Sequence, residues 1–332
     1  MKKLLYFCLA GLIFNGSSAL AQGNVNVEEI LKAGLNDLNT YMGYYVEPAA
    51  KGFIYSMGSG WSQTAKPHGV LGFDLKFAVS GAAVPSRYET FTFNPAEFEK
   101  IRVVGANGSP VQLPTLYGDP NTGGTLEIFD KETEMTLATA DIPPGIDIPV
   151  KYVPAPLIQG AVGLPAGFEV IGRFIPKTTI EDTEVSQWGI GVKHDLKQYF
   201  EGINIIPVDF SVLVAYNSLD ARYHIDEVQG QVASMNVETW TVQGLVSKKI
   251  AILTVYGAIG YNSGSSDYNM LGTYEINGTS ESFTDPVKLN YEAKGAMGTL
   301  GARLKFGPIF LNGDYTFQEF NTVNIGLGVS IR

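Results

Sequence analysis

The stretch that decides the fold is the last one, VNIGLGVSIR, which runs from Val323 to Arg332. Apolar residues alternate along it with small or polar ones. Because successive side chains of a strand point to opposite faces of a sheet, the stretch predicts a strand with one apolar and one polar face. Its length suits the roughly 9–11 residues that a tilted strand needs to cross a bilayer. This is typical of the closing strand of a transmembrane barrel.

The other end of the chain reads as an export signal. Residues 1–21 contain two lysines, an apolar run from Leu4 to Phe14 and the small-residue motif Ala19-Leu20-Ala21. This order is that of a secretory signal peptide, and we expect cleavage after Ala21. The single cysteine, Cys8, would leave with the signal, so no disulfide is expected in the mature chain.

Composition limits the class of protein. The formal net charge of −10 would become −12 once the signal and its two lysines are removed, which argues against a nucleic-acid partner. After the signal no run of about 18 apolar residues occurs, so no transmembrane helix is expected. The 38 glycines, 17 tyrosines and 18 phenylalanines suit a barrel with aromatic girdles, but they also suit a soluble β-sandwich.

One amphipathic helix is expected, from Asn26 to Met42. Asn26 with Glu29 three residues later forms a capping box. The apolar residues that recur at helical spacing are Val27, Ile30, Leu31, Leu35, Leu38 and Met42. We expect residues 22–50 to plug a barrel lumen or to lie at its periplasmic rim; a helix packed on a soluble sheet is the alternative.

Residues 51–332 are expected to form the barrel. Alternation predicts strands at Phe53–Trp61 and Leu71–Val79. Weaker strands are expected at Tyr88–Phe93, Ile101–Val104 and Met135–Ala140. Residues 94–156 read as an irregular insertion. Its end, 141–156, is expected to be a loop because prolines cannot donate to a ladder.

The second half of the chain has a more regular pattern. Nine strands are predicted, near 157–163, 167–175, 185–194, 205–216, 237–246, 250–261, 294–306, 308–317 and 323–331. Short connections alternate with longer ones, as periplasmic turns and outer loops do in barrels. With a periplasmic C-terminus an odd number of strands must precede these nine. We therefore predict an all-β transmembrane antiparallel barrel of about 14 strands, with 12 as the alternative.

A two-residue turn at Gly307-Pro308 predicts a hairpin register. It pairs Phe306 with Ile309 and Arg303 with Asn312, which keeps the apolar partners on one face. The inward-facing, lumen-lining candidates are Glu169, Arg173, Lys193, Asp209, Arg303, Lys305, Asn312 and Asp314. Such mixed charges suit either a water-filled pore or a lumen closed by salt bridges. Seven aromatic residues lie near predicted strand ends, and we expect most of them to be anchors at the membrane interface: Trp61, Trp188, Tyr216, Tyr223, Trp240, Tyr256 and Tyr315.

Signals of chemistry are sparse. The three histidines, His68, His194 and His224, are far apart in sequence, and neither His194 nor His224 has a serine at a telling spacing. No local cluster suggests a metal site, and no loop suggests a phosphate site. We therefore expect no catalytic, cofactor or metal site and no enzyme activity.

Several motifs resemble those of a family of uncharacterised outer-membrane barrel proteins from Bacteroidota. They are Gly60-Trp61, Thr64 to His68, Gly72-Phe73-Asp74, Leu113-Pro114-Thr115 with Gly118, Gln159-Gly160 with Gly163-Leu164-Pro165, and Gly189 to His194. The resemblance covers most of the mature chain and implies a β-barrel, without a substrate or active residues. In layout the chain is more distantly similar to the long-chain fatty-acid (FadL-like) outer-membrane transporters.

Together these features predict a porin-like protein of a Gram-negative cell outer membrane. Passive transport of a small hydrophobic molecule is the expected function, with outer-membrane lipid and that solute as partners. The first alternative is a non-transporting structural or surface-binding barrel, and the second is a soluble periplasmic β protein. Oligomeric state is left open.

Overall fold

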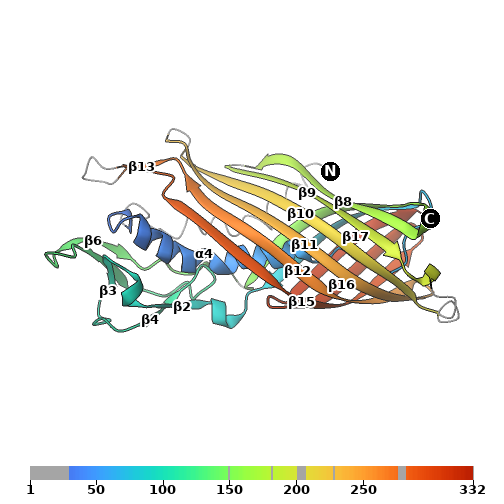
Figure 1. Ribbon diagram of the computed structural model, residues 1–332, viewed down its shortest axis with the longest axis horizontal. Helices are drawn as coiled ribbons and strands as arrows, with labels where there is room; N and C mark the ends of the chain where they lie inside the picture. The colour runs from blue at the N-terminus through green and yellow to red at the C-terminus, as the bar shows by residue number, and fades with distance from the viewer. Residues whose placement is uncertain are drawn as a thin grey trace.

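The computed structural model describes residues 30–148, 150–180, 182–199, 207–226, 229–275 and 282–331. It shows an elongated barrel that contains one long helix, with a small head of short strands at the end remote from the C-terminus (Figure 1). The predicted signal peptide and the predicted capping box at Asn26 lie outside the described residues.

Ten antiparallel strands form one closed barrel. Its first strand, β1, pairs with the last, β17, so that Phe73 lies opposite Ile331. The strands, in chain order, are β1 (Phe73–Ala83), β7 (Tyr152–Gly163), β8 (Phe168–Ile180), β9 (Thr183–Asp195), β10 (Asp209–Asp226), β11 (Gln231–Ile250), β12 (Leu253–Leu271), β15 (Val287–Phe306), β16 (Ile309–Phe317) and β17 (Thr322–Ile331). Closure removes every free sheet edge along the fully paired part of the wall.

The nine strands predicted after residue 156 are confirmed, but the total of 14, or 12, is wrong. Among the described residues one barrel strand, β1, precedes them. The other early strands contain three to six residues, which is too short to cross a bilayer. The prediction that an odd number of strands precedes these nine therefore holds, with one strand.

The head consists of these short strands. β2 (Thr90–Phe93) pairs with β4 (Val111–Pro114), and β5 (Thr125–Phe129) lies between β3 (Ile101–Val103) and β6 (Thr136–Asp141). A separate hairpin of β13 (Thr273–Glu275) and β14 (Ser282–Thr284) extends from the same end of the barrel. Four 3-10 turns complete the described structure: η1 (Ser86–Tyr88), η2 (Pro95–Glu97), η3 (Pro165–Gly167) and η4 (Lys197–Tyr199).

The predicted loop at 141–156 is wrong at its end, because β7 begins at Tyr152 and contains Pro154 and Pro156. Over this stretch β7 pairs with β1 alone, since its ladder to β8 has only five residue pairs, from Gln159 to Gly163. A proline without N–H is tolerated where a strand has no second partner. We call this unpaired length, between Tyr152–Ile158 of β7 and Phe174–Ile180 of β8, the seam.

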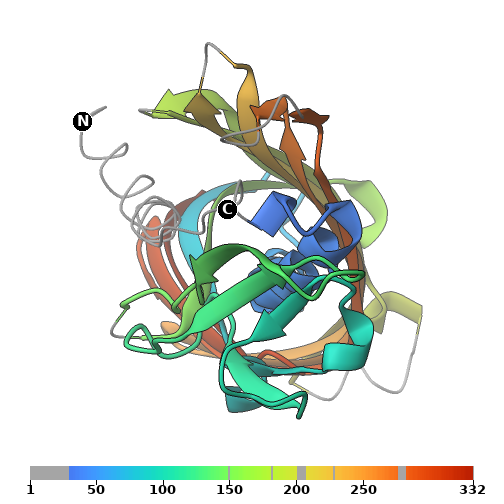
Figure 2. The same cartoon turned by 90° about the vertical axis from the view of Figure 1, so that its left-hand side faces the viewer.

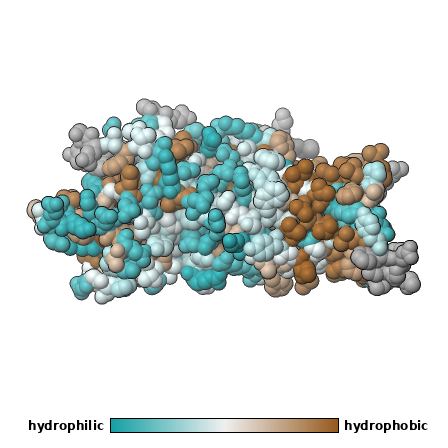
Figure 3. Space-filling model, viewed as in Figure 1, coloured by the Kyte–Doolittle hydropathy of each residue, from teal (hydrophilic) through white to brown (hydrophobic). Residues whose placement is uncertain are grey.

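The outward face of the barrel carries an apolar band at the C-terminal end. Its most exposed residues include Ile259 (78%), Leu300 (63%) and Ile325 (61%). Figure 3 shows the band beside the short turns, whereas the head end is mostly hydrophilic. Farther along β15, away from the C-terminal end, the outward residues become Lys294 and Glu292. No helix among the described residues is long and apolar enough to span a membrane.

An aromatic row marks the edge of this band that faces the head. The ring centroids of Trp188 and Tyr216 are 5.1 Å apart, and those of Tyr216 and Trp240 are 4.9 Å apart. Aromatic rings of this kind gather at the interface between membrane and water. Two predicted anchors, Trp61 and Tyr256, are instead buried inside the barrel.

The single long helix, α4, runs from Leu35 to Gly58. It therefore starts later than predicted, after Gly34 (φ 102°), and extends past Met42 through most of the predicted strand Phe53–Trp61. Barrel strands surround it, so apolar residues are favourable on most of its faces and the alternation at 53–57 does not report a strand. At Gly52 an added Cβ would lie 2.3 Å from Val153 of β7, so this helix lies directly against the wall.

Candidate functional site: the plugged lumen

Helix α4 and the residues after it fill the interior of the barrel. Figure 2, viewed from the head end, shows α4 inside the ring of strands with the head in front of it. After Gly58 the chain continues as an extended segment, residues 59–72, which we call the strap. The strap ends at Gly72, beside the first residue of β1, at the same end of the barrel as the C-terminus. The chain thus passes through the lumen before the first strand begins.

The last carbonyl groups of α4 lack partners within the helix, as at every helix C-terminus. Here inward side chains of the barrel provide them. Thr241 donates to the carbonyl of Gly58 (3.0 Å), and Lys76 donates to that of Gly60 (2.8 Å), two residues beyond the end of the helix. Cations are favourable at this end of the helix because the helix dipole is negative there. The sequence of α4 has no basic residue in its last turn, so the wall supplies the charge.

We call α4 and the strap together the plug. Arg173 is the central contact between the wall of the barrel and this plug. Its guanidinium donates to the carbonyls of Met57 (2.8 Å) and Ser59 (2.7 Å) and to Oε1 of Gln159 (3.0 Å). The same group lies 3.7 Å above the ring of Trp61. Arg173 is only 2% exposed, so these contacts replace its hydration.

The strap is fixed again near its end by buried charges. Lys193 Nζ lies 2.7 Å from Glu169 Oε1 and donates to the carbonyl of Thr64 (3.3 Å). His68 contacts the second oxygen of Glu169 through Nδ1 (2.7 Å) and through its backbone N–H (2.8 Å). Its Nε2 lies 3.4 Å from Asp74 Oδ2. Together these contacts tie the strap to β8, β9 and β1.

The structure places six of the eight lumen-lining candidates in the interior with at most 7% exposure: Glu169, Arg173, Lys193, Arg303, Asn312 and Asp314. Glu169, Arg173 and Lys193 contact α4 or the strap. Asp314 instead accepts from Tyr256 (2.9 Å) and Asn324 (3.0 Å). Asp209 and Lys305 are half-buried, on strands β10 and β15 near the C-terminal end.

Sequence reasoning missed several interior residues. Asp74 and Lys76 occupy alternate positions of the predicted strand Leu71–Val79, so their inward orientation was readable from the same alternation. Trp61 and His68 gave no such signal, because nothing in the sequence shows that the strap lies inside the barrel. The predicted hairpin register is confirmed, since Phe306 pairs with Ile309.

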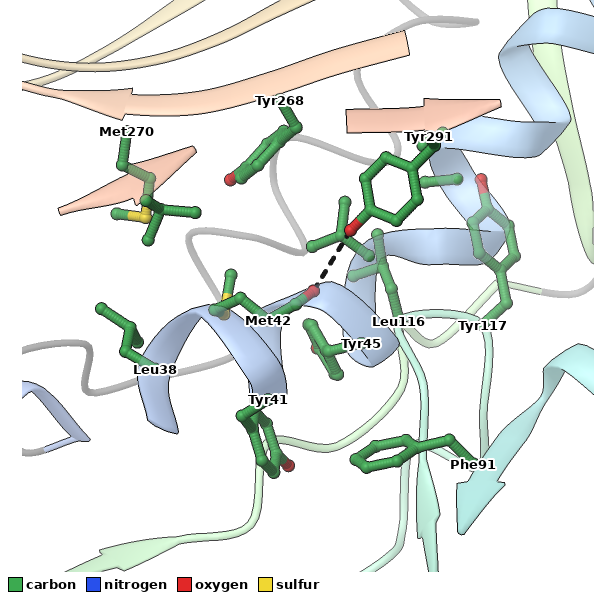
Figure 4. Packing of buried hydrophobic residues seen from close by; sticks show 14 of the residues in the cluster. Leu38, Tyr41, Met42, Tyr45, Phe91, Leu116, Tyr117, Tyr268, Met270 and Tyr291 are labelled. Carbon is green, nitrogen blue, oxygen red and sulfur yellow. Dashed lines mark hydrogen bonds between the residues drawn. The ribbon is translucent and has the colours of Figure 1, made fainter. Parts of the chain in front are cut away.

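Beyond the aromatic row the interior is apolar. Tyrosines and methionines from α4, β12 and β15 pack there with residues of the head (Figure 4). The hydroxyl of Tyr291 donates to the carbonyl of Gly43 (2.9 Å), and Tyr41 packs edge-on against Phe91 of the head (5.6 Å between centroids). The head is thus part of the same core as the helix.

Two carboxylates attach the head. Asp37, 1% exposed, accepts from the backbone N–H groups of Glu99 (2.9 Å) and Lys100 (2.7 Å). Glu319, in the β16–β17 loop, accepts from Tyr55 (2.8 Å), Tyr88 (2.7 Å) and Arg87 (2.8 Å). Burial alone would raise the pKa of Glu319, but these hydrogen bonds hold that pKa below its ordinary value.

The match to a family extends from residue 1 to residue 331. The chain belongs to the family of unknown function DUF6588. None of the curated proteins matches it.

Solved structures that align with this DUF6588 protein are β-barrels with very low similarity. The translocator domain of the autotransporter NalP from Neisseria meningitidis aligns at 9% identity and TM-score 0.30, over 80% of this chain and 90% of that chain. Ail from Yersinia pestis, solved with a heparin analogue, aligns at 9% and 0.24, over 78% and 97%. The toluene transporter TodX from Pseudomonas putida aligns at 8% and 0.26, over 86% and 76%. At such scores we draw no conclusion from them.

Proposed function

We propose that this protein is a sealed outer-membrane barrel that holds a binding head at the cell surface and does not transport. One observation carries the proposal: inward side chains of the wall hydrogen-bond the backbone of the plug over residues 57–64. Arg173 and Lys76 alone engage three of those carbonyl groups. A segment that is bonded in this way is a structural part of the barrel.

The orientation follows from the surface. The apolar band and its aromatic row match a membrane-spanning belt, and short turns beside a C-terminus are the periplasmic habit of such barrels. The two-residue turns at Ala251–Ile252 and Gly307–Pro308 lie at that end. The head, at the opposite end, would then face the outside. The predicted export signal supports the same location.

A binding role for the head is supported by its outer strand. β6 pairs with β5 alone and exposes Leu137 (52%), next to Met135 (66%). Exposed apolar groups beside a free strand edge are typical of interaction sites. Packing of the head on α4 would keep this strand rigid at the tip of the molecule.

Conductance tests the sealed lumen. The full mature chain, reconstituted in planar bilayers and in liposomes, should give neither stable current steps nor swelling with small sugars, while a general porin does in the same vesicles. Steady conductance of the wild-type protein would contradict the proposal.

Orientation is tested on intact cells by adding Thr139→Cys or Lys249→Cys to the mature chain. A membrane-impermeant maleimide should label position 139 and leave position 249 unlabelled.

Passive transport of a small hydrophobic molecule, the function expected from a barrel with a lumen and an N-terminal segment that could gate it, is the second candidate. The seam favours it, because the wall is unpaired there just beyond the aromatic row, next to the apolar interior. Transport would require α4 to move. The pair Gly58→Cys and Asn262→Cys tests this, since a Cβ at Gly58 would lie 2.5 Å from Asn262 Cγ. Uptake of a hydrophobic solute that stops on oxidation of this pair would establish transport. Equal, background uptake in both redox states would exclude it.

A further inference from the structure

Arg303 is a buried cation with two hydrogen-bond donor atoms that are not used. It points inward from β15, near the periplasmic end of the barrel in the proposed orientation, and is 7% exposed. Its Nε and Nη2 atoms are buried and have no hydrogen-bond partner. Buried polar groups are almost always satisfied, so two free donors on one guanidinium need an explanation.

The two free atoms form one edge of the guanidinium. This edge is the fork that binds carboxylate or phosphate oxygens through two parallel hydrogen bonds. The plane of the group is fixed, because Arg303 lies 4.0 Å above the ring of Phe310, which is itself fully buried. The fork is therefore pre-oriented, as it would be in a binding site rather than in a mobile surface arginine.

The neighbours of Arg303 are also unsatisfied. Its cross-strand partner on β16, Asn312, is 1% exposed, and both its Nδ2 and its Oδ1 lack a partner. An amide N–H beside a guanidinium fork adds a donor for an oxyanion. At the rim Lys305, two residues along β15, donates to Ser330 Oγ (3.1 Å). This half-buried lysine adds positive charge on the path from the periplasm.

The charge balance of the interior gives independent support. The described buried charges that the wall strands turn inward are four cations, Lys76, Arg173, Lys193 and Arg303, and three anions, Asp74, Glu169 and Asp314. Lys193 pairs with Glu169, while Lys76 and Arg173 face carbonyls at the end of α4. Asp74 and Glu169 are close enough to attract Arg303, but neither accepts a hydrogen bond from its Nε or Nη2, so an added oxyanion would satisfy these two buried donors.

From these observations we infer that Arg303, with Asn312, is a binding site for an oxyanion group, a carboxylate or a phosphate, that enters from the periplasmic mouth. The group could belong to a free solute or to a phospholipid headgroup of the adjacent leaflet. The site lies outside the contacts that seal the lumen, so it stands whether or not the barrel transports.

The first test is thermal unfolding of the full chain in detergent, with inorganic phosphate or acetate as probe and chloride at matched ionic strength. Both probes should raise the unfolding midpoint of the wild-type protein by several degrees over chloride. The rise should persist in the control Lys294→Gln, an exposed charge on the outward face of β15, and should vanish in Arg303→Gln. An equal rise in all three proteins, or no rise in the wild type, would overturn the site.

A second measurement follows the wild-type protein and uses the conservative variant Arg303→Lys only to assign a resonance. Side-chain NMR of the arginine Nε–H groups in wild-type protein should show one resonance that shifts and saturates with phosphate, assigned to Arg303 by its loss in Arg303→Lys. If no such resonance moves, the free donors are satisfied by water and the inference fails. In nanodiscs, saturation by phosphatidylglycerol without added phosphate would assign the headgroup as the source. Saturation by phosphate alone would assign a free solute.

Discussion

Replacing Arg173 by Met is the most direct test of how the plug is held. The change keeps an apolar side chain against Trp61 but removes the donors to Met57 and Ser59. Each buried carbonyl that loses its partner costs about 1–3 kcal/mol, and the lost contact with the indole ring adds up to about 2 kcal/mol. Removing the buried charge also removes the free-energy cost of its desolvation, which offsets part of this loss of stability. We expect a net loss of about 3 kcal/mol, roughly a hundredfold in the unfolding equilibrium constant.

The assay is reversible urea unfolding in lipid vesicles, followed by far-UV circular dichroism. A matched control is Arg222→Met, because Arg222 is 51% exposed and its ion pair is with Asp220. Exposed pairs of this kind contribute less than about 1 kcal/mol. Equal stability of Arg173→Met and Arg222→Met would refute the reasoning, because it would mean that the contacts to α4 contribute nothing.

Three further predictions concern the membrane position and the head. Brominated lipids should quench a variant that keeps only Trp188 and should leave one that keeps only Trp61 unquenched; equal quenching would place the band wrongly. Asp37→Ala should cost about 2–4 kcal/mol, because two buried N–H groups lose their acceptor, and should make the head sensitive to protease, whereas Asn36→Ala should not. Since the folded-state pKa of Glu319 is depressed, its contribution is present above the ordinary carboxyl pKa and is lost as pH falls below about 4.5. The protection of the loop amides, relative to their intrinsic exchange rate at each pH, should therefore fall on acidification in the wild type and stay level in Glu319→Gln.

The barrel itself was largely predictable from the sequence, because strand alternation depends only on which face meets lipid. The nine later strands follow from that rule, and the pairing of Arg303 with Asn312 follows from it together with the two-residue turn at Gly307-Pro308. The strand total could not be read in the same way, because short strands such as β3 alternate like barrel strands until their length is known. Three predicted strands of the head, at Tyr88–Phe93, Ile101–Val104 and Met135–Ala140, were therefore counted in the wall, together with the helical stretch at Phe53–Trp61.

Of the interior residues, only those on the barrel strands could be predicted. Inward charges such as Glu169 and Lys193 appear as polar positions between apolar ones. Their partners on the strap, Thr64 and His68, do not, because the strap has no regular period and its place inside the barrel is a tertiary fact. The helix was misread for the same reason: enclosure by strands makes most of its faces apolar, and the capping box that suggested its start lies outside the described residues.

The path of the strap also constrains the order of assembly. The chain runs through the lumen before β1, and closure joins β1 to β17, whose residues lie about 250 positions apart in sequence. Threading a ring that has already closed would require the chain before β1 to pass lengthwise through the lumen, so we expect α4 to be enclosed before these two strands meet. Such long-range contacts form late in folding. Arg173 on β8 and Lys193 on β9 would therefore bond to the plug before the ring closes, and mutations there should leave insertion intact while slowing closure.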